Sequence, residues 1–169
     1  MFIHLHTHSH YSLLDGLGTI DGLIAEAKNQ GATALALTDH GSMYGVIEFY
    51  QKCHKAGLKP IIGVESYITP GQLTDRSSKE KPYHLILLAE NNEGYRNLLK
   101  LTSIAHLEGF YYKPRLDWET LKKYSAGLIA STACLNGPLA RHVLARQNDT
   151  AEKNLKTLLD IFGPDILFI

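Results

Sequence analysis

Short runs of apolar residues alternate along this chain with longer stretches in which apolar positions recur every three or four residues. The short runs predict β-strands at residues 2–8, 34–38, 59–68, 83–89, 127–131 and 165–169. The longer stretches predict helices at residues 20–30, 42–56, 91–107, 117–124, 137–146 and 149–162. This alternation is typical of βα units, so we expect an α/β fold of about six units with mainly parallel strands.

Capping residues set the boundaries of the first two predicted helices. Thr19 or Asp21 is expected to cap the first helix, and Gly31 to end it. Ser42 is expected to open the second helix, and Gly57 to end it. The segment 69–82 has no periodicity and is rich in Gly, Pro, Ser and charge, so it predicts a mobile surface loop.

The last predicted strand bears on domain organisation. The 169 residues, 44% of them hydrophobic, suffice for the core of one domain. A buried parallel strand needs cover on both faces, yet residues 165–169 end the sequence at the edge where α/β folds bind ligands. We therefore expect a single domain over residues 1–169, a partial β/α barrel truncated at its C-terminal end.

Charge and cysteine content narrow the functional classes. Lys plus Arg and Asp plus Glu both number 17, so no overall field draws the chain to nucleic acid or anionic lipid. The sequence contains neither a signal peptide nor an apolar run of the ~20 residues that span a bilayer, which favours a cytoplasmic protein without membrane contact. Two cysteines, Cys53 and Cys134, are too few for a disulfide scaffold and suit free thiols or a metal ligand.

Histidines gather at the N-terminus, where His4, His6, His8 and His10 alternate with other residues. On a strand, residues two apart point to the same side, so His4, His6 and His8 would share one face. Burying three imidazoles without partners would cost several kcal/mol, so a metal site is favoured over a polar edge strand.

Other metal-binding side chains lie where further predicted strands end. Asp39 and His40 follow the second strand, Glu65 lies within the third, and Cys134 follows the fifth. His84 lies near the start of the fourth strand, so strand geometry leaves its reach less obvious. Taken singly, each of these side chains has an ordinary structural explanation. The carboxyl ends of parallel strands meet at one edge of a sheet, however, so together these side chains favour a shared site.

This set of donors, with Asp15, suits borderline divalent ions such as Zn²⁺, Mn²⁺ or Fe²⁺ better than Ca²⁺ or Mg²⁺. It holds more donors than one tetrahedral ion uses, which indicates a cluster of two or three ions. Such clusters hydrolyse phosphate esters, because one ion activates water while another neutralises phosphoryl charge.

The sequence resembles a known family at these positions. His6-Thr7-His8-Ser9, Thr38-Asp39-His40-Gly41 and Gly63-Val64-Glu65 are similar to the motifs of the polymerase and histidinol phosphatase (PHP) superfamily. The stretches SLLDG, TDHGSMYGVIEFY, GLKPIIGVESYI, HLILLAENNEGYRNLLKL, EGFYYKPRLD and GLIASTACLNG look like the amino-terminal PHP domain of bacterial replicative DNA polymerase III alpha subunits. The resemblance spans essentially the whole chain.

The resemblance implies a distorted, TIM-like β/α barrel that binds two or three Zn²⁺ or Mn²⁺ ions. The metal ligands it implies are His6, His8, Asp15, His40, Glu65, His84 and Cys134. It places His4 and His10 outside the ligand set, leaves Asp39 to orient the loop that carries His40, and includes a downstream Asp-x-His pair that this sequence does not reach.

For function, the resemblance implies the PHP region of a replicative, nucleotidyl-transferring DNA polymerase, with 3′–5′ exonuclease or proofreading chemistry. Partners would be a DNA 3′ end and other replicase subunits, such as a sliding clamp, a proofreading subunit or a loader. Two alternatives stay open. One is a free-standing phosphatase of the histidinol phosphatase type, and the other is a non-catalytic scaffold for the polymerase.

Candidate catalytic residues are His6, His8, His40 and Glu65, with Arg115 as a further candidate because it could reach a phosphate beside the metal ligands. Tyrosines are also candidates for stacking on a nucleotide, namely Tyr11, Tyr44, Tyr111 and Tyr112.

Overall fold

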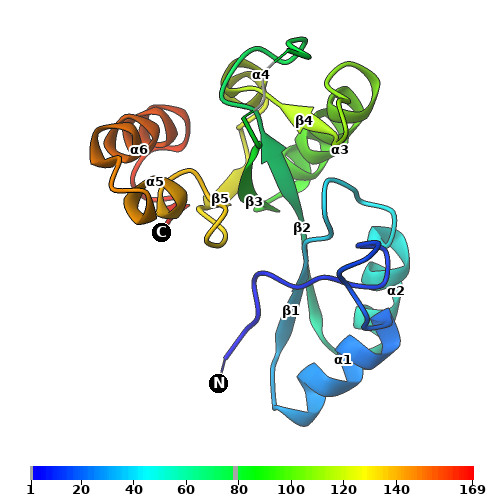
Figure 1. The fold of residues 1–169 in the computed structure, drawn as a ribbon. Helices are drawn as coiled ribbons and strands as arrows, with labels where there is room; N and C mark the ends of the chain where they lie inside the picture. Colours follow the sequence, from blue (N-terminus) through cyan, green and yellow to red (C-terminus); the bar gives the residue numbers. More distant parts are fainter. Residues whose placement is uncertain (1, 78–79) are drawn as a thin grey trace.

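A mixed β-sheet forms the centre of the computed structural model, which describes residues 2–77 and 80–169. Within these ranges the strands follow the spatial order β1-β2-β3-β5-β6, and β4 pairs with β2 (Figure 1). The strands are β1 (Ala34–Leu37), β2 (Lys59–Ile68), β3 (Tyr83–Ala89), β4 (Arg115–Leu116), β5 (Leu128–Ser131) and β6 (Leu167–Phe168). The helices are α1 (Ile20–Asn29), α2 (Val46–Ala56), α3 (Asn92–Leu107), α4 (Trp118–Lys123), α5 (Ala140–Leu144) and α6 (Asn148–Phe162).

The direction of β3 departs from the predicted parallel arrangement. Parallel pairing joins β1 to β2, β2 to β4 and β5 to β6, but β3 runs antiparallel to both β2 and β5. The α/β class and the partial-barrel architecture are confirmed, whereas the expectation of parallel strands is wrong at β3. The physical reason lies in the connection from β2 to β3. Its described residues, 69–77 and 80–82, contain no helix, so no helical crossover returns the chain to its original direction.

The N-terminal segment was predicted as a strand over residues 2–8, and this prediction is wrong. Two backbone hydrogen bonds tie the segment to the edge of β1, from Ala36 N to His4 O (3.0 Å) and from Thr38 N to Thr7 O (2.9 Å). Between these two hydrogen bonds the segment advances three residues, from His4 to Thr7, while the partner chain advances two, from Ala36 to Thr38. The register therefore shifts, and no regular ladder forms. The Thr38 hydroxyl compensates by accepting a hydrogen bond from Thr7 N at 2.8 Å.

Local capping explains the start of α1 and the end of α2. The Thr19 hydroxyl accepts a hydrogen bond from Gly22 N at 3.2 Å at the start of α1. Gly57 ends α2 in the left-handed region with φ 73°, as predicted. The predicted start at Ser42 is wrong, because α2 begins at Val46 after turns that pack beneath Tyr11. A Cβ on Gly45 would lie 2.7 Å from the Tyr11 ring, so a side chain at this position would clash with Tyr11.

Three hydrophobic clusters pack against the sheet in the described residues, and the smallest consists of Ala36, Ile86 and Leu88. The other two involve the helices. One lies between α1, α2 and β1 around Ile20, Leu37 and Phe49. The larger one packs α3, α4 and α6 against β2, β3 and β5, with Leu85 and Leu98 fully buried. Figure 1 shows β2 passing from the α1–α2 side of the molecule to the α3–α4 side. This long strand therefore positions residues of both halves against one another.

A charged side chain anchors the loop between β2 and β3. Residues 69–77 and 80–82 lie in the predicted loop 69–82, and residues 78–79 fall outside the described ranges. The buried Arg115 guanidinium donates to the carbonyl oxygens of Gly109 (3.1 Å), Leu73 (3.3 Å) and Asp75 (2.8 Å). With Leu73 also buried, the first half of the loop is fixed to the body of the domain.

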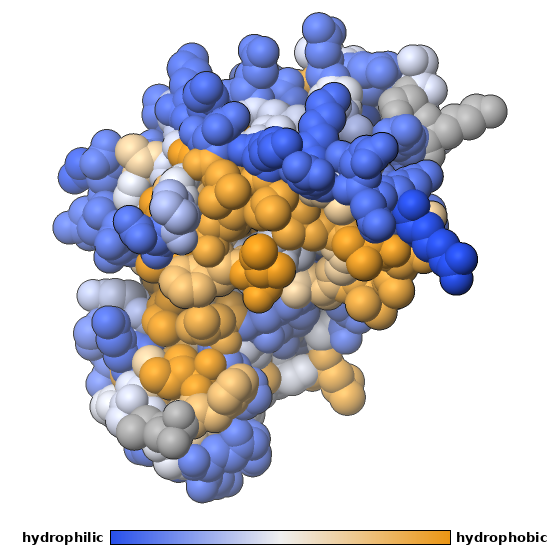
Figure 2. Space-filling view, turned by 90° about the vertical axis from the view of Figure 1, so that its left-hand side faces the viewer, coloured by the Kyte–Doolittle hydropathy of each residue, from blue (hydrophilic) through white to orange (hydrophobic). Residues whose placement is uncertain are grey.

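One side of the molecule is apolar at its surface. Figure 2 shows a band of hydrophobic side chains on the side that faces left in Figure 1. A cavity of about 520 Å³ opens on the sheet and is lined by residues that include Leu5, Ile61, Leu88, Ile129 and Phe168. Among residues 2–77 and 80–169, no helix has the length and hydrophobicity that crossing a membrane requires.

Candidate metal centre

A single buried carboxylate organises the candidate site. Glu65, on β2, is 1% exposed, and four imidazoles converge on it. Its Oε1 lies 3.3 Å from His6 Nε2 and 2.9 Å from His84 Nδ1. Its Oε2 lies 3.4 Å from His8 Nε2 and 2.5 Å from His40 Nδ1. Four of the histidines predicted from the sequence therefore share one partner.

The sheet explains how two of these residues reach Glu65. His40 follows β1 and forms an isolated parallel bridge with Glu65, fixed by hydrogen bonds from Gly41 N to Glu65 O (2.8 Å) and from Glu65 N to Asp39 O (3.2 Å). His84 pairs with Tyr67 across the antiparallel β2–β3 ladder, which places it diagonally from Glu65 on the same face. Because β3 is reversed, its beginning meets the carboxyl end of β2.

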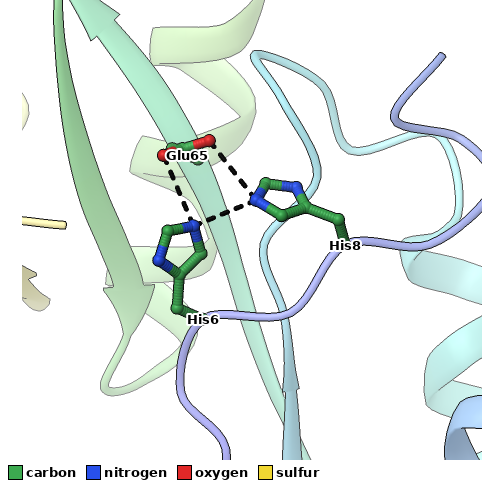
Figure 3. A group of neighbouring side chains, drawn as sticks. All are labelled: His6, His8 and Glu65. Atoms are coloured by element: carbon green, nitrogen blue, oxygen red, sulfur yellow. Dashed lines mark hydrogen bonds and ion pairs between the residues drawn. The ribbon is translucent and has the colours of Figure 1, made fainter. Parts of the chain in front are cut away.

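His6 and His8 approach from the N-terminal segment. Figure 3 shows both rings turned toward Glu65 from a segment that crosses beside β2. Their Nε2 atoms lie 3.0 Å apart, and the His8 ring stacks on the His40 ring with centroids 4.1 Å apart. His6 and His8 are two residues apart, and this spacing places their imidazoles side by side even though the segment is not a regular strand.

Asp15 and Cys134 lie at the edges of this cluster. Asp15 Oδ2 is 2.7 Å from His40 Nε2, and its side chain is 62% exposed. Cys134 follows β5, and its Sγ lies 3.6 Å from His84 Nδ1. Because β5 is antiparallel to β3 and thus runs in the direction of β2, its carboxyl end reaches the same edge of the sheet.

The geometry fits divalent metal ions. Three groups each place three ligand atoms within 4.8 Å of one another: His6, His8 and Glu65; His8, Asp15 and His40; and His40, Glu65 and His84. In the part of the chain that the structure describes, His40 Nδ1 and Glu65 Oε2 are buried and lack a hydrogen bond of acceptable angle, although they lie close together. Imidazole and carboxylate donors with unused lone pairs suit Zn²⁺, Mn²⁺ or Fe²⁺.

Charge in the cluster is unevenly shared. Burial opposes ionisation of Glu65, but contacts with His40, His6 and His84 outweigh it and hold the pKa of the carboxyl well below its usual range. The Glu65 carboxylate, assisted by Asp15, raises the pKa of His40 against the effect of burial. Burial, and then the nearby His40, lower the pKa of His8. The two shifts are opposite, so His40 holds a proton more strongly than His8 does.

A hydroxyl fixes the tautomer of His8. Ser12 Oγ donates its only proton to Asp39 Oδ1 at 2.7 Å. It therefore accepts from its other two neighbours, His40 N at 3.1 Å and His8 Nδ1 at 3.1 Å. His8 consequently carries its proton on Nδ1, and the lone pair on Nε2 points toward Glu65 and His6.

Asp39 holds the segment that contains Ser9 and Ser12 in place. Besides Ser12, its buried carboxylate accepts hydrogen bonds from Ser9 N (2.7 Å) and Ser9 Oγ (2.8 Å). Asp39 thus connects the end of β1 to the segment that carries His8. Ser9 and Ser12 were not identified as site residues from the sequence, although both lie within a few residues of the histidine run.

Other predicted residues lie outside the cluster. His4 contacts Gln30 at the surface (Nε2 to Oε1, 3.3 Å), and His10 lies against the Tyr11 ring. The Arg115 guanidinium is occupied by three carbonyl oxygens, so we replace its interpretation as a catalytic phosphate ligand by that of a loop anchor.

The two cysteines should differ in reactivity. Cys53 is fully buried, and burial raises the pKa of its thiol to about 11, whereas Cys134 is half-buried at the cluster. We expect a disulfide reagent at pH 8 to modify one thiol in the native protein and both in guanidinium. Zn²⁺ should slow the native reaction at least about ten-fold if Cys134 binds metal, and Cys134→Ser should abolish that reaction. Equal reactivity of both native thiols would contradict the assignment.

Comparison with known proteins agrees with the motifs. The chain matches the model of the PHP domain over residues 4–169. It is 49% identical over 170 residues to the DNA polymerase III subunit alpha of Borreliella burgdorferi, covering 97% of this chain and 15% of that protein. It is 44% identical over 173 residues to that of Aquifex aeolicus, covering 98% of this chain and 15% of that protein. The chain thus spans about 15% of the length of these curated relatives.

A solved structure also aligns with part of the chain. It is an amidohydrolase from Chromobacterium violaceum with bound sulfate and no metal, which is 25% identical with a TM-score of 0.44, and the alignment covers 60% of this chain and 34% of the amidohydrolase.

Proposed function

This chain belongs to the PHP domain family, and from this premise we propose that its cluster holds two or three Zn²⁺ or Mn²⁺ ions and hydrolyses phosphodiesters at the 3′ end of DNA. The observation that carries the proposal is the buried Glu65 carboxylate with four imidazoles around it. An isolated carboxylate at this depth is costly, and such an arrangement is typical of metal sites.

The proposed ligands are the convergent donors and the two edge residues: His6, His8, Asp15, His40, Glu65, His84 and Cys134. When bound, divalent ions supply Lewis-acid chemistry that neutralises phosphoryl charge and makes water a stronger nucleophile at neutral pH.

The chain's own residues prepare this site. Glu65 supplies negative charge that offsets cations in a buried position, and its two oxygens face different pairs of histidines. Ser12 keeps the Nε2 lone pair of His8 available, and Asp39 holds Ser12 in place. The backbone bridge between His40 and Glu65 fixes their separation before any ligand arrives.

We also propose that these residues form the PHP domain of a replicative DNA polymerase, in view of the relatives above. Template-directed DNA synthesis, contact with other replicase subunits and a cytoplasmic location would then be properties of that larger protein.

The test compares His6→Ala with His4→Ala, two changes on the same segment. We expect the chain loaded with Zn²⁺ or Mn²⁺ to shorten a 5′-labelled single strand from its 3′ end, and chelation to stop it. His6→Ala should lower both bound metal and hydrolysis at least about 100-fold, because it removes a ligand, while His4→Ala should act like wild type.

Other outcomes would change the proposal. Hydrolysis of a small phosphate monoester such as histidinol phosphate, with DNA left intact, would favour the phosphatase alternative. A purified protein that binds no transition metal at stoichiometric levels would favour the scaffold alternative.

A further inference from the structure

A second cavity adjoins the metal centre and shares His84 with it. The cavity has a volume of about 700 Å³, large enough for a nucleotide. Basic and aromatic side chains dominate its lining, among them Tyr67, Lys81, Tyr112, Lys113, Arg115 and Arg141. Glu80 is the carboxylate among the lining residues that the structure describes.

Tyr67 forms the wall between the two sites. Its ring centroid lies 5.2 Å from that of His84 and 6.0 Å from that of His40. On the other side, Lys113 Nζ lies 5.2 Å from the centre of the same ring. Burial, with Glu65 and then Asp15 adding to it, raises the pKa of Tyr67 to about 12, so the wall is neutral at physiological pH.

The lining lysines are available to a ligand and the arginines are not. Arg115 donates to three carbonyl oxygens, and Arg141 donates to those of Lys81, Pro82 and Asn136. Among residues 2–77 and 80–169, neither Lys81 nor Lys113 forms an ion pair with a carboxylate. Both lysines are exposed and line the cavity, whose walls also contain the two hydrogen-bonded arginines.

Tyr112 presents an aromatic face at the same cavity. It has φ 59°, a conformation that costs a non-glycine residue about 1–3 kcal/mol, yet its side chain is 83% exposed. Burial of the ring therefore does not offset this strain. Its ring lies 4.6 Å from that of Tyr111, which is in turn backed by the Arg115 guanidinium at 5.1 Å. The pair forms a supported stacking surface.

We propose that this cavity binds the nucleotide adjoining the scissile phosphate of a single-stranded DNA end, with its base on Tyr112 and its phosphate at Lys113 and Lys81. This inference rests on the proposed function, since it takes the reacting phosphate to lie on the metal side of Tyr67. Stacking on tyrosine is tolerant of base identity, and lysines bind phosphate without reading sequence. The site therefore selects unpaired ends rather than particular bases.

Binding without metal tests the proposal independently of catalysis. A fluorescent oligothymidylate is titrated into the full chain in excess chelator, and affinity is followed by anisotropy at several salt concentrations. We expect Tyr112→Ala to weaken binding about ten-fold or more. Lys113→Gln should lower the salt slope by about 0.7, the value for one phosphate contact on a single strand, and Lys113→Arg should restore it.

Matched controls separate local from general effects. Lys100 also lies over a tyrosine ring, that of Tyr124 at 5.9 Å, but on α3, and Tyr50 on α2 is 49% exposed and does not line the cavity. Lys100→Gln and Tyr50→Ala should bind like wild type. If Lys113→Gln and Tyr112→Ala bind like these controls, the proposal is overturned. If all proteins fail to hydrolyse DNA with metal but the two variants still bind it more weakly, the cavity assignment stands and the exonuclease proposal fails.

Discussion

Glu65→Gln is expected to lower metal-dependent phosphodiester hydrolysis about a thousand-fold, which corresponds to a loss of about 4 kcal/mol in transition-state stabilisation. Glutamine keeps the size of the side chain and loses its charge. The carboxylate contacts His6, His8, His40 and His84, so one change affects each proposed metal position that includes Glu65. Bound metal, measured after dialysis by atomic emission, should fall together with the rate.

Glu90→Gln provides the control for the loss of one carboxylate, because Glu90 is exposed after β3. It should leave both bound metal and rate unchanged. An active Glu65→Gln protein with full metal content would contradict the central role given to Glu65.

Asp39→Ala is expected to lower the free energy of unfolding by about 3–5 kcal/mol, the range for breaking a buried charged network. The change leaves Ser9 N, Ser9 Oγ and Ser12 Oγ without their acceptor. For a chain of this length the melting temperature should drop by roughly 10 °C. Differential scanning calorimetry of the metal-free protein measures this effect.

The same variant distinguishes positioning from ligation. Asp39→Asn keeps one acceptor oxygen, so we expect it to recover part of the stability and most of the bound metal. The control is Asp160→Ala, at an exposed position on α6, which should change neither the free energy of unfolding nor the amount of bound metal. Complete loss of metal in a well-folded Asp39→Asn protein would indicate that the Asp39 carboxylate binds an ion directly.

Strand and helix positions followed well from the sequence where apolar runs had sharp ends. The predicted strands 59–68 and 83–89 match β2 and β3 to the residue, because each run lies between polar or turn-forming residues. Strand direction did not follow, since a strand buried on both faces has the same pattern in either direction. The position of His84 was unclear for this reason, and the reversal of β3 explains it.

The residues that support the site were harder to predict. A buried arginine such as Arg115 has the sequence appearance of a surface charge, and only the carbonyl groups that approach it in the fold explain its burial. Ser9 and Ser12 are ordinary serines in sequence, and their role depends on Asp39, which lies about thirty residues away. The histidines and Glu65 stood out because their residue types are uncommon in such positions.

The antiparallel pairing of β3 with β2 links the register of the two strands to the completeness of the candidate metal site. If β3 slipped by one residue against β2, His84 would turn to the opposite face and Leu85 would take its place. A misaligned chain could then offer no imidazole at that position, while a correctly aligned chain would be stabilised by any cation it captured. Divalent ions present during refolding should therefore increase the fraction of molecules with the native β2–β3 register, relative to registers shifted by one residue.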